Sequence, residues 1–218
     1  MKSLIWLFVA ALVVVTVAQQ PGITSPAQHQ ETFTRIERIG EANSRAFFPF
    51  TTSVGIYTVR HDGLGELSAT GAAKRRSFTL KLGYGGRIER MYFVERGSDV
   101  ILAYEVTDHR SGWGYLVRMD QTSMKQRWIA PLNSYNIGPG LIEMETGYFS
   151  GANTLCKIDL ATGRYLWQLS DLEKQYSPGI EEFQEPVLIG NQVVFREHGT
   201  REREVKVEKG SGTILGNR

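Results

Sequence analysis

One hairpin pattern occurs twice in this chain of 218 residues and constrains its fold more than any other feature. Residues 115–128 and residues 154–167 align as a strand that ends in Asp, a short turn, and a second strand that closes on Trp. The Trp residues lie 167 − 128 = 39 positions apart, and the Asp residues are separated by the same interval. A recurring period of this length predicts a stacked-repeat architecture. The landmark residues are Asp120, Asp159, Trp128 and Trp167.

The residue types of the pattern fit a tight antiparallel hairpin. An Asp at the start of a turn accepts hydrogen bonds from backbone N–H groups further along, and Gly163 supplies the positive φ that such a turn needs. A Trp that closes the second strand offers a large flat surface for packing on a neighbouring unit. A weaker copy spans residues 204–216, where Gly212 matches Gly163 and Gly216 takes the place of Trp. The faintest copy lies within residues 68–82.

Another hairpin lies upstream of the copies, so that one unit consists of four short strands. Residues 186–189 and 192–196, for example, flank the turn signal Gly190-Asn191. No helical period follows residue 40, and the 23 glycines fit a fold with many tight turns. A four-stranded unit of about 40 residues is the signature of a propeller blade, which must stack on its neighbours to bury its faces. We therefore predict an all-β fold, a β-propeller of about four four-stranded antiparallel blades over residues 46–218.

Residues 157–167 resemble the repeat of the pyrroloquinoline-quinone-like (PQQ-like) β-propeller family. The shared pattern is an apolar strand, Asp, a small-residue turn that ends in Gly, and Trp four residues later. In that family the Trp packs between adjacent blades and its indole N–H bonds to backbone. The resemblance implies a structural blade-docking role here for five residues, namely Trp128, Trp167, Asp120, Asp159 and Gly163.

The family contains quinone-dependent dehydrogenases and non-enzymatic scaffolds, and the resemblance favours the second group. The dehydrogenases are much longer chains of about eight blades. This sequence has no adjacent pair of cysteines of the kind that some of those enzymes carry, since Cys156 is its single cysteine. It also has no convincing set of calcium-ligating acids. We therefore predict no cofactor and no metal, and Cys156 is expected to be a buried, inert thiol.

The N-terminus has the tripartite pattern of a secretory signal. A short basic start precedes the apolar stretch Leu4–Ala18, which ends in small residues that a signal peptidase reads. At 15 residues the stretch is shorter than the roughly 20 that span a bilayer, so a retained anchor is the weaker alternative. Residues 1–18 are thus predicted to be a signal peptide, with cleavage after Ala18. The mature protein would then be periplasmic or extracellular, with no stable membrane insertion.

Residues 19–45 are predicted to be a flexible leader that contains one possible strand. Within it, residues 32–39 alternate apolar and polar side chains. Ring closure in a propeller usually needs a strand from one terminus to complete the last blade, because this removes exposed edges. Residues 32–39 are the candidate for that closing strand. The alternatives are a half ring that dimerises, or a degraded or truncated relative of a larger ring.

Charge and polar residues add few functional signals. The net charge of +2 is too small to indicate nucleic-acid binding, and no nucleic-acid motif accompanies it. The basic residues Arg87 and Arg90 and the acidic stretch of Glu182 and Glu185 are expected to be solvated. The predicted contact residues at the propeller rim are Trp113, in a Gly-Trp-Gly turn, and three histidines beside acids, His61, His109 and His198.

Taken together, these features favour a binding function over catalysis. We predict an exported binding or scaffold propeller that mediates interaction with an unidentified protein or small ligand. One alternative is a small hydrolase or lyase that uses the rim histidines and neighbouring acids. The other is a subunit of a larger envelope assembly.

Overall fold

The computed structural model describes residues 30–40, 46–60, 66–70, 76–80, 86–108, 111–172, 182–198 and 203–217. In these ranges the chain forms β-strands joined by turns and loops. None of the helical structure within them is long and apolar enough to cross a membrane. The predicted signal peptide, residues 1–18, lies outside the described residues.

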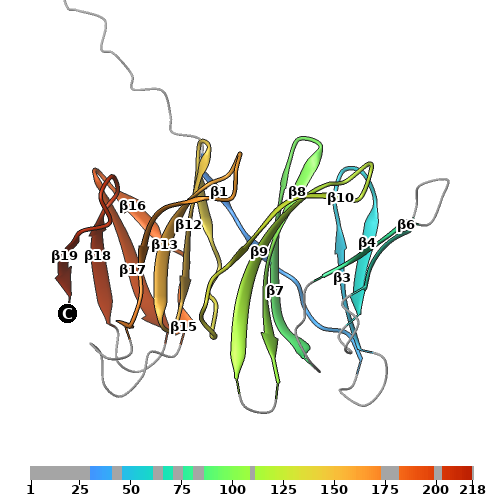
Figure 1. The fold of residues 1–218 in the computed structure, drawn as a ribbon, viewed down its shortest axis with the longest axis horizontal. Helices are drawn as coiled ribbons and strands as arrows, with labels where there is room; N and C mark the ends of the chain where they lie inside the picture. The colour runs from blue at the N-terminus through green and yellow to red at the C-terminus, as the bar shows by residue number, and fades with distance from the viewer. Residues whose placement is uncertain are drawn as a thin grey trace, which may run out of the picture.

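The strands form four antiparallel sheets that follow one another along the chain, and we number these blades 1 to 4 (Figure 1). Blade 1 consists of β3 (Phe47–Thr51), β4 (Ile56–Arg60), β5 (Glu66–Thr70) and β6 (Arg76–Thr79). Blade 2 consists of β7 (Arg87–Arg96), β8 (Asp99–Thr107), β9 (Gly112–Asp120) and β10 (Lys125–Pro131). Blade 3 consists of β11 (Leu141–Glu143), β12 (Thr146–Gly151), β13 (Thr154–Asp159) and β14 (Tyr165–Leu169). Blade 4 consists of β15 (Glu182–Phe183), β16 (Val187–Ile189), β17 (Gln192–His198), β18 (Glu204–Glu208) and β19 (Ile214–Asn217).

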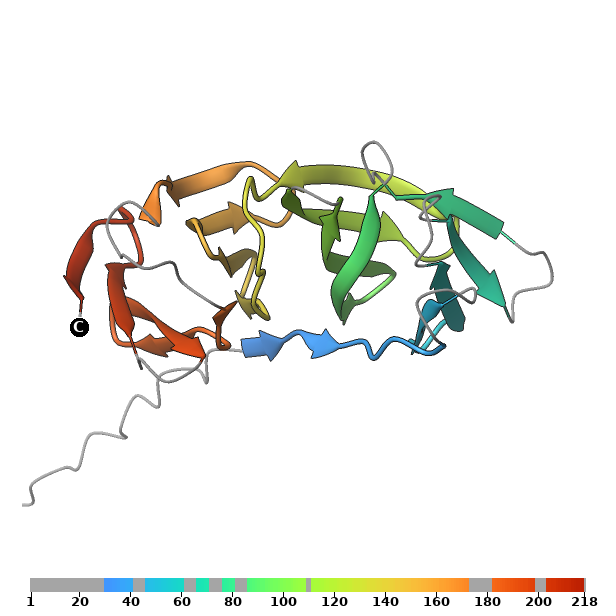
Figure 2. The ribbon, with the colours of Figure 1, turned by 90° about the horizontal axis from the view of Figure 1, so that it is seen from below.

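The four blades stand side by side as an open arc. Figure 2 shows the last strands of the blades along the outer edge of the arc and their first strands along the opposite edge. Blade 1 and blade 4 lie at opposite ends in both views (Figures 1 and 2). The prediction of an all-β propeller with four blades is therefore confirmed, and the ring is incomplete.

The N-terminal segment runs along the inner edge of this arc instead of closing it. Strand β1 (Gln30–Thr32) pairs with β11 of blade 3, and β2 (Thr34–Arg35) pairs with β7 of blade 2. An isolated bridge between Ile39 and Phe47 then leads into blade 1. The closing strand expected at residues 32–39 thus joins blades 2 and 3, and not the last blade as expected. The physical reason is that the inner edges of blades 2 and 3 offer unpaired backbone groups that an extended segment satisfies.

Strands of the interior and terminal blades differ in their burial pattern. Strand β8, in blade 2, is buried at every position except its last because both faces of its sheet are covered. Strand β4, in blade 1, alternates between buried and more exposed positions, and β18 in blade 4 does the same. Their alternating sequences therefore reflect sheets with only one covered face.

The core is divided among the three interfaces between neighbouring blades. One apolar cluster joins blades 1 and 2, a second joins blades 2 and 3, and a third joins blades 3 and 4. Cys156 lies in the second cluster, fully buried and in no disulfide, as expected. Burial raises the pKa of its thiol, so the thiol stays protonated and unreactive at neutral pH.

Candidate functional site

The same acid-initiated turn occurs in blades 2, 3 and 4. Asp120 accepts a hydrogen bond from the N–H of Ser123 at 2.7 Å, and Asp159 accepts one from the N–H of Thr162 at 2.8 Å. In blade 4 Glu208 takes the place of Asp and accepts from the N–H of Ser211. These hydrogen bonds hold the pKa of each of the three carboxyl groups below its ordinary value, and that of Glu208 at about 2.

The fifth residue of each turn has a positive φ. Gly163 and Gly212 have φ values of 73° and 76°, and Met124 adopts 56° at the equivalent position of blade 2. A side chain on Gly163 would lie 2.6 Å from an indole carbon of Trp128 of the preceding blade, and Gly212 has the same relation to Trp167. Each glycine therefore makes room for the Trp of the preceding blade.

Both tryptophans dock on the turn of the next blade. The indole nitrogen of Trp128 donates to the carbonyl oxygen of Leu160 at 2.8 Å, and that of Trp167 donates to the carbonyl oxygen of Lys209 at 3.0 Å. In each case the accepting residue lies three positions before the turn glycine. Blade 2 receives no such Trp, and Met124 is packed instead in the core between blades 1 and 2.

A cation reinforces each Trp contact. Arg118 Nη1 donates to the Leu160 carbonyl at 2.7 Å, and Lys157 Nζ donates to the Lys209 carbonyl at 3.0 Å. Arg118 also pairs through Nε with Asp99, whose side chain is buried. Sequence reasoning missed these cations, although they occupy one repeat position, since 157 − 118 = 39. It also missed Glu208, which lies 49 residues after Asp159, the same interval that separates Gly212 from Gly163.

The strand registers place the Trp and the cation in one row across each sheet, which we call the docking row. Trp128 lies opposite Arg118, and Trp167 lies opposite Lys157, with a β-bulge just before the Trp in both blades. The row of blade 2 is Val94, Ile101, Arg118 and Trp128. The row of blade 3 is Leu141, Tyr148, Lys157 and Trp167. The row of blade 4 is Val187, Val194, Lys206 and Gly216.

Two of the four predicted rim residues, Trp113 and His198, lie in the described part of the chain. His61 and His109 lie outside the described residues, so a shared histidine site is not tested. His198 is exposed at the end of β17. Trp113 lies within strand β9, paired with Val106, and not in a turn as the sequence suggested. It remains 38% exposed, which keeps it accessible to a partner.

A cleft of about 300 Å³ lies between the N-terminal segment and blade 4, and we call it the channel cleft. Its apolar walls come from Phe33, Tyr92, Pro139 and Phe183. Its polar rim comes from Arg35, Glu182, Gln184, Glu185 and His198. A mainly apolar cavity with a few polar groups of this size is typical of a binding site.

A network of charged residues lies behind the channel cleft. Arg90 Nη1 pairs with Glu182 at 2.7 Å, and Arg90 Nε lies 3.8 Å from the buried carboxylate of Glu105. The Tyr92 hydroxyl donates to Glu182 at 2.8 Å. Burial raises the pKa of both Glu105 and Tyr92. Arg90 and Glu182 were expected to be solvated, but the fold joins them across blades 2 and 4, which no local sequence signal reveals.

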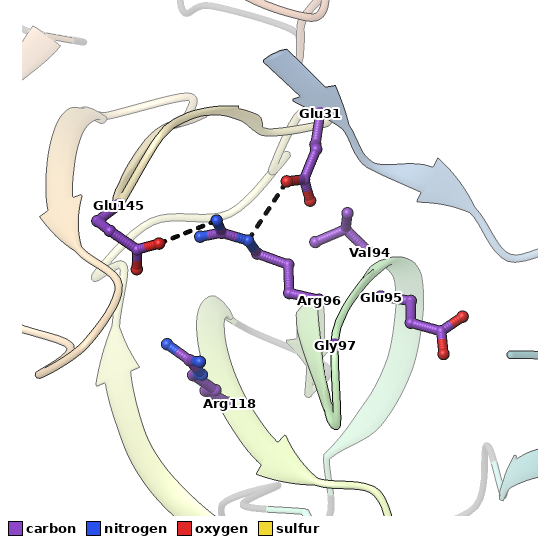
Figure 3. A pocket seen from close by; sticks show the side chains of 7 residues that line it. All are labelled: Glu31, Val94, Glu95, Arg96, Gly97, Arg118 and Glu145. Atoms are coloured by element: carbon purple, nitrogen blue, oxygen red, sulfur yellow. Dashed lines mark hydrogen bonds and ion pairs between the residues drawn. The ribbon is translucent and has the colours of Figure 1, made fainter. Parts of the chain in front are cut away.

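A second, larger and more polar cleft of about 600 Å³ surrounds Arg96 (Figure 3). Arg96 pairs with Glu31 of β1 at 3.4 Å and with Glu145 of blade 3 at 3.1 Å. Figure 3 shows the two carboxylates on either side of the guanidinium, with Arg118 nearby. The arginine thus joins the N-terminal segment to blades 2 and 3, and its charge is already balanced by protein groups.

Neither cleft brings its described acidic and histidine side chains together as a metal site. Among the described residues, no three His, Cys, Asp or Glu side chains are grouped as a metal site requires. The channel cleft has an apolar surface, with positively and negatively charged side chains at its mouth. Such an arrangement suits recognition of a chain segment better than coordination of an ion.

Comparison with known proteins finds similarity among solved structures. No protein-family model matches this chain, and no curated protein matches it. Among solved structures, the crystal structure of BamB from Moraxella catarrhalis is similar, with 16% sequence identity and a TM-score of 0.47. The match covers 85% of this chain and 51% of that one, so this chain spans about half the length of that relative.

Proposed function

We propose that this protein is an exported scaffold that binds an extended segment of a protein partner in the channel cleft. The observation that carries the proposal is that this chain already binds an extended segment of its own beside the cleft. Strands β1 and β2 add to two different blades by backbone pairing. Strand addition of this kind is a common mode of peptide recognition.

The contacts of the N-terminal segment support this mode of binding. Phe33 is buried between β1 and β2, with its ring 5.3 Å from that of Phe149 in an edge-to-face contact. Its N–H donates to the carbonyl oxygen of Gly140 at 3.3 Å. Backbone pairing therefore fixes the segment while one aromatic side chain anchors it in an apolar site.

The lining of the cleft defines the chemistry of the partner segment. The apolar walls formed by Phe33, Tyr92 and Phe183 fit one apolar side chain, and the cations and acids at the rim fit polar neighbours on either side. Glu182 is already paired with Arg90, so it supports the wall instead of acting on a substrate. We therefore expect binding without chemical change.

Photo-crosslinking in the native host tests this proposal. A photoreactive amino acid replaces Gln184, which is exposed on the rim of the cleft, or Leu166, which is exposed on the outer edge of blade 3. We expect an adduct with a protein partner at Gln184 and none at Leu166. The added substitution His198→Trp narrows the cleft and should abolish the adduct. The proposal would be contradicted by equal adducts at both positions or by no adduct at Gln184. It would also be contradicted if the Gln184 adduct still formed in the protein that carries His198→Trp.

Export is tested separately by mass spectrometry of the protein recovered from the host. Cleavage after Ala18 predicts a mature chain that begins at Gln19. The protein should be found outside the cytoplasm. A chain that retains residues 1–18 in the cytoplasm would contradict export.

A further inference from the structure

The two walls of the channel cleft carry the same arrangement of side chains with opposite charge. On the wall formed by the N-terminal segment, Phe33 lines the cleft and Arg35 follows two residues later. On the wall formed by blade 4, Phe183 lines the cleft and Glu185 follows at the same interval. The apolar interior therefore has a cation at one side and an anion at the other, which gives the cleft a direction.

Glu185 has no cation to balance its charge within the described ranges. Its side chain is exposed at the mouth of the cleft, but partial burial raises the pKa of its carboxyl above the ordinary value. Glu182, which also lines the cleft, is held by Arg90 at 2.7 Å and by the Tyr92 hydroxyl at 2.8 Å. A carboxylate that loses water without gaining a cation is stabilised when a ligand supplies one.

Arg35 on the opposite wall is only loosely paired. Its Nε lies 3.5 Å from a carboxylate oxygen of Glu37, and both side chains are largely exposed. An exposed ion pair of this kind contributes little, so the guanidinium can turn toward an incoming anion. Burial raises the pKa of Tyr92 in the cleft wall, and the positive charge of Arg35 opposes this rise. The charge of Arg35 therefore already acts inside the cleft.

The N-terminal segment itself carries the pattern that such a cleft suits. In residues 31–35 an acid lies two positions before an aromatic residue, and a base lies two positions after it. The acid, Glu31, pairs with Arg96 at 3.4 Å, and the aromatic residue, Phe33, is buried. Side chains two positions apart in an extended segment project to the same side. One short segment can thus place an apolar group in a cleft and a charge at each end of it.

We propose that the partner segment carries an apolar residue with a basic residue two positions to one side and an acidic residue two positions to the other. The apolar side chain fills the channel cleft, the base pairs with Glu185 of blade 4, and the acid pairs with Arg35. Because the two charges lie on opposite walls, they fix the direction in which the segment binds. This inference rests on the proposed function, since it names the chemistry of the segment bound in that cleft.

NMR titration of the isotope-labelled mature protein with synthetic peptides tests the inference. Two peptides are centred on Glu-Thr-Phe-Thr-Lys and on the reverse order, Lys-Thr-Phe-Thr-Glu. A neutral peptide is centred on Gln-Thr-Phe-Thr-Gln, and a doubly acidic one on Glu-Thr-Phe-Thr-Glu. One of the first two should bind about tenfold more tightly than its reverse and than the neutral peptide, because it alone gains both ion pairs. Its binding should shift the amide signal of Gln184 on the rim of the cleft.

Substitution of Glu185 should change which peptide binds best. Glu185→Lys makes both walls of the cleft positive, so the doubly acidic peptide should become the tightest binder. Glu145→Lys is the matched control, because Glu145 is also an exposed glutamate but lines the other cleft. This control should leave the order of affinities unchanged. The amide spectra of the free variants establish that each one is folded.

The outcomes separate this inference from the proposed function. If the neutral peptide shifts the cleft signals and binds as tightly as the charged peptides, the charge pattern is wrong, although the cleft still binds a segment. If both charged orders bind equally, or if Glu185→Lys leaves the order of affinities unchanged, the walls do not fix a direction and the inference is overturned. If no peptide shifts the cleft signals, the inference fails, and the adduct at Gln184 decides separately whether the proposed function stands.

Discussion

The indole nitrogen of Trp128 lies 2.8 Å from the carbonyl oxygen of Leu160, the second residue of the turn in the next blade. The same carbonyl accepts a second hydrogen bond from Arg118 at 2.7 Å. One backbone oxygen thus joins two residues of blade 2 to blade 3. The contact is repeated one blade later by Trp167, Lys157 and the Lys209 carbonyl, so it is a property of the repeat.

Loss of a docking Trp should destabilise the whole arc. Trp128→Ala removes a buried indole from the interface between blades 2 and 3 and should lower the free energy of unfolding by about 3–5 kcal/mol. Trp113→Ala is the control and should lower it by less than about 1 kcal/mol, because Trp113 is 38% exposed. Urea unfolding followed by circular dichroism measures both. Equal losses would show that Trp128 has no special role.

Gly163 should not tolerate a side chain, because its φ is positive and because the indole of Trp128 lies against it. Gly163→Ala introduces a left-handed alanine and a methyl group 2.6 Å from Trp128, and it should cost about 3 kcal/mol of stability. Gly190→Ala has a positive φ but open space around it, and should cost only about 1 kcal/mol. The difference between the two variants, measured by thermal unfolding, reports the steric contribution of the Trp. Equal costs would mean that the Trp does not pack on the turn.

The cations of the two docking rows should differ in importance. Arg118→Met removes one of the two arginines paired with the buried Asp99, leaving Arg127 at 2.8 Å, and also removes the hydrogen bond to the Leu160 carbonyl. It should cost about 2 kcal/mol. Lys157→Met removes a hydrogen bond to the Lys209 carbonyl and should cost about 1 kcal/mol. Denaturant titration of the two variants compares these losses directly. A larger loss for Lys157→Met would contradict the role given to Asp99.

Glu105 should make the protein less stable as the pH rises. Burial raises its pKa in the folded state above the ordinary value, so the folded protein holds this proton more tightly than the unfolded chain. The stabilisation from protonated Glu105 is fully present below the pKa that this carboxyl has in the unfolded chain. It is lost as the pH rises through the pKa that the carboxyl has in the folded protein. The stability of the wild type relative to Glu105→Gln should therefore fall as the pH rises above the ordinary glutamate pKa of about 4. A flat difference would show that Glu105 is not desolvated.

Glu208 should have the opposite pH dependence. Hydrogen bonds from Ser211 lower its pKa to about 2 in the folded state. Its contribution to stability is therefore present above the unfolded pKa and is lost as the pH falls toward 2. The stability of the wild type relative to Glu208→Gln should decrease over that acidic interval and stay constant above about pH 5. A constant difference over the whole range would mean that the turn does not bind the carboxylate.

The repeated hairpin could be predicted from the sequence, but not all of the residues that form the contact between blades. The Asp-to-Trp hairpins were predictable because their strands and turns are local, and they appear as β9–β10 and β13–β14. Arg118 and Lys157 also occupy one position of the repeat, 39 residues apart. They were not recognised as contact residues, because a charged residue in a strand ordinarily indicates a solvated position. Their partners are backbone carbonyls of another blade, which residue types alone do not reveal.

The channel cleft could not be predicted, because its residues come from segments far apart in the sequence. Phe33 lies between β1 and β2, Tyr92 on β7 and Phe183 on β15, and only the arc brings them together. The pairing of residues 32–39 was misjudged for a related reason. Alternation identifies a strand but not the edge that the strand joins, and the inner edges of blades 2 and 3 were available to it.

Hydrogen exchange of the indole N–H groups, followed by NMR of the mature protein, tests the central claim most directly. If Trp128 and Trp167 lock each blade to the next, their indole N–H signals should exchange slowly, at rates close to those of the core amides. The indole N–H of Trp113 should exchange rapidly. Fast exchange at Trp128 and Trp167, equal to that of Trp113, would contradict the repeated docking contact on which the propeller assignment is built.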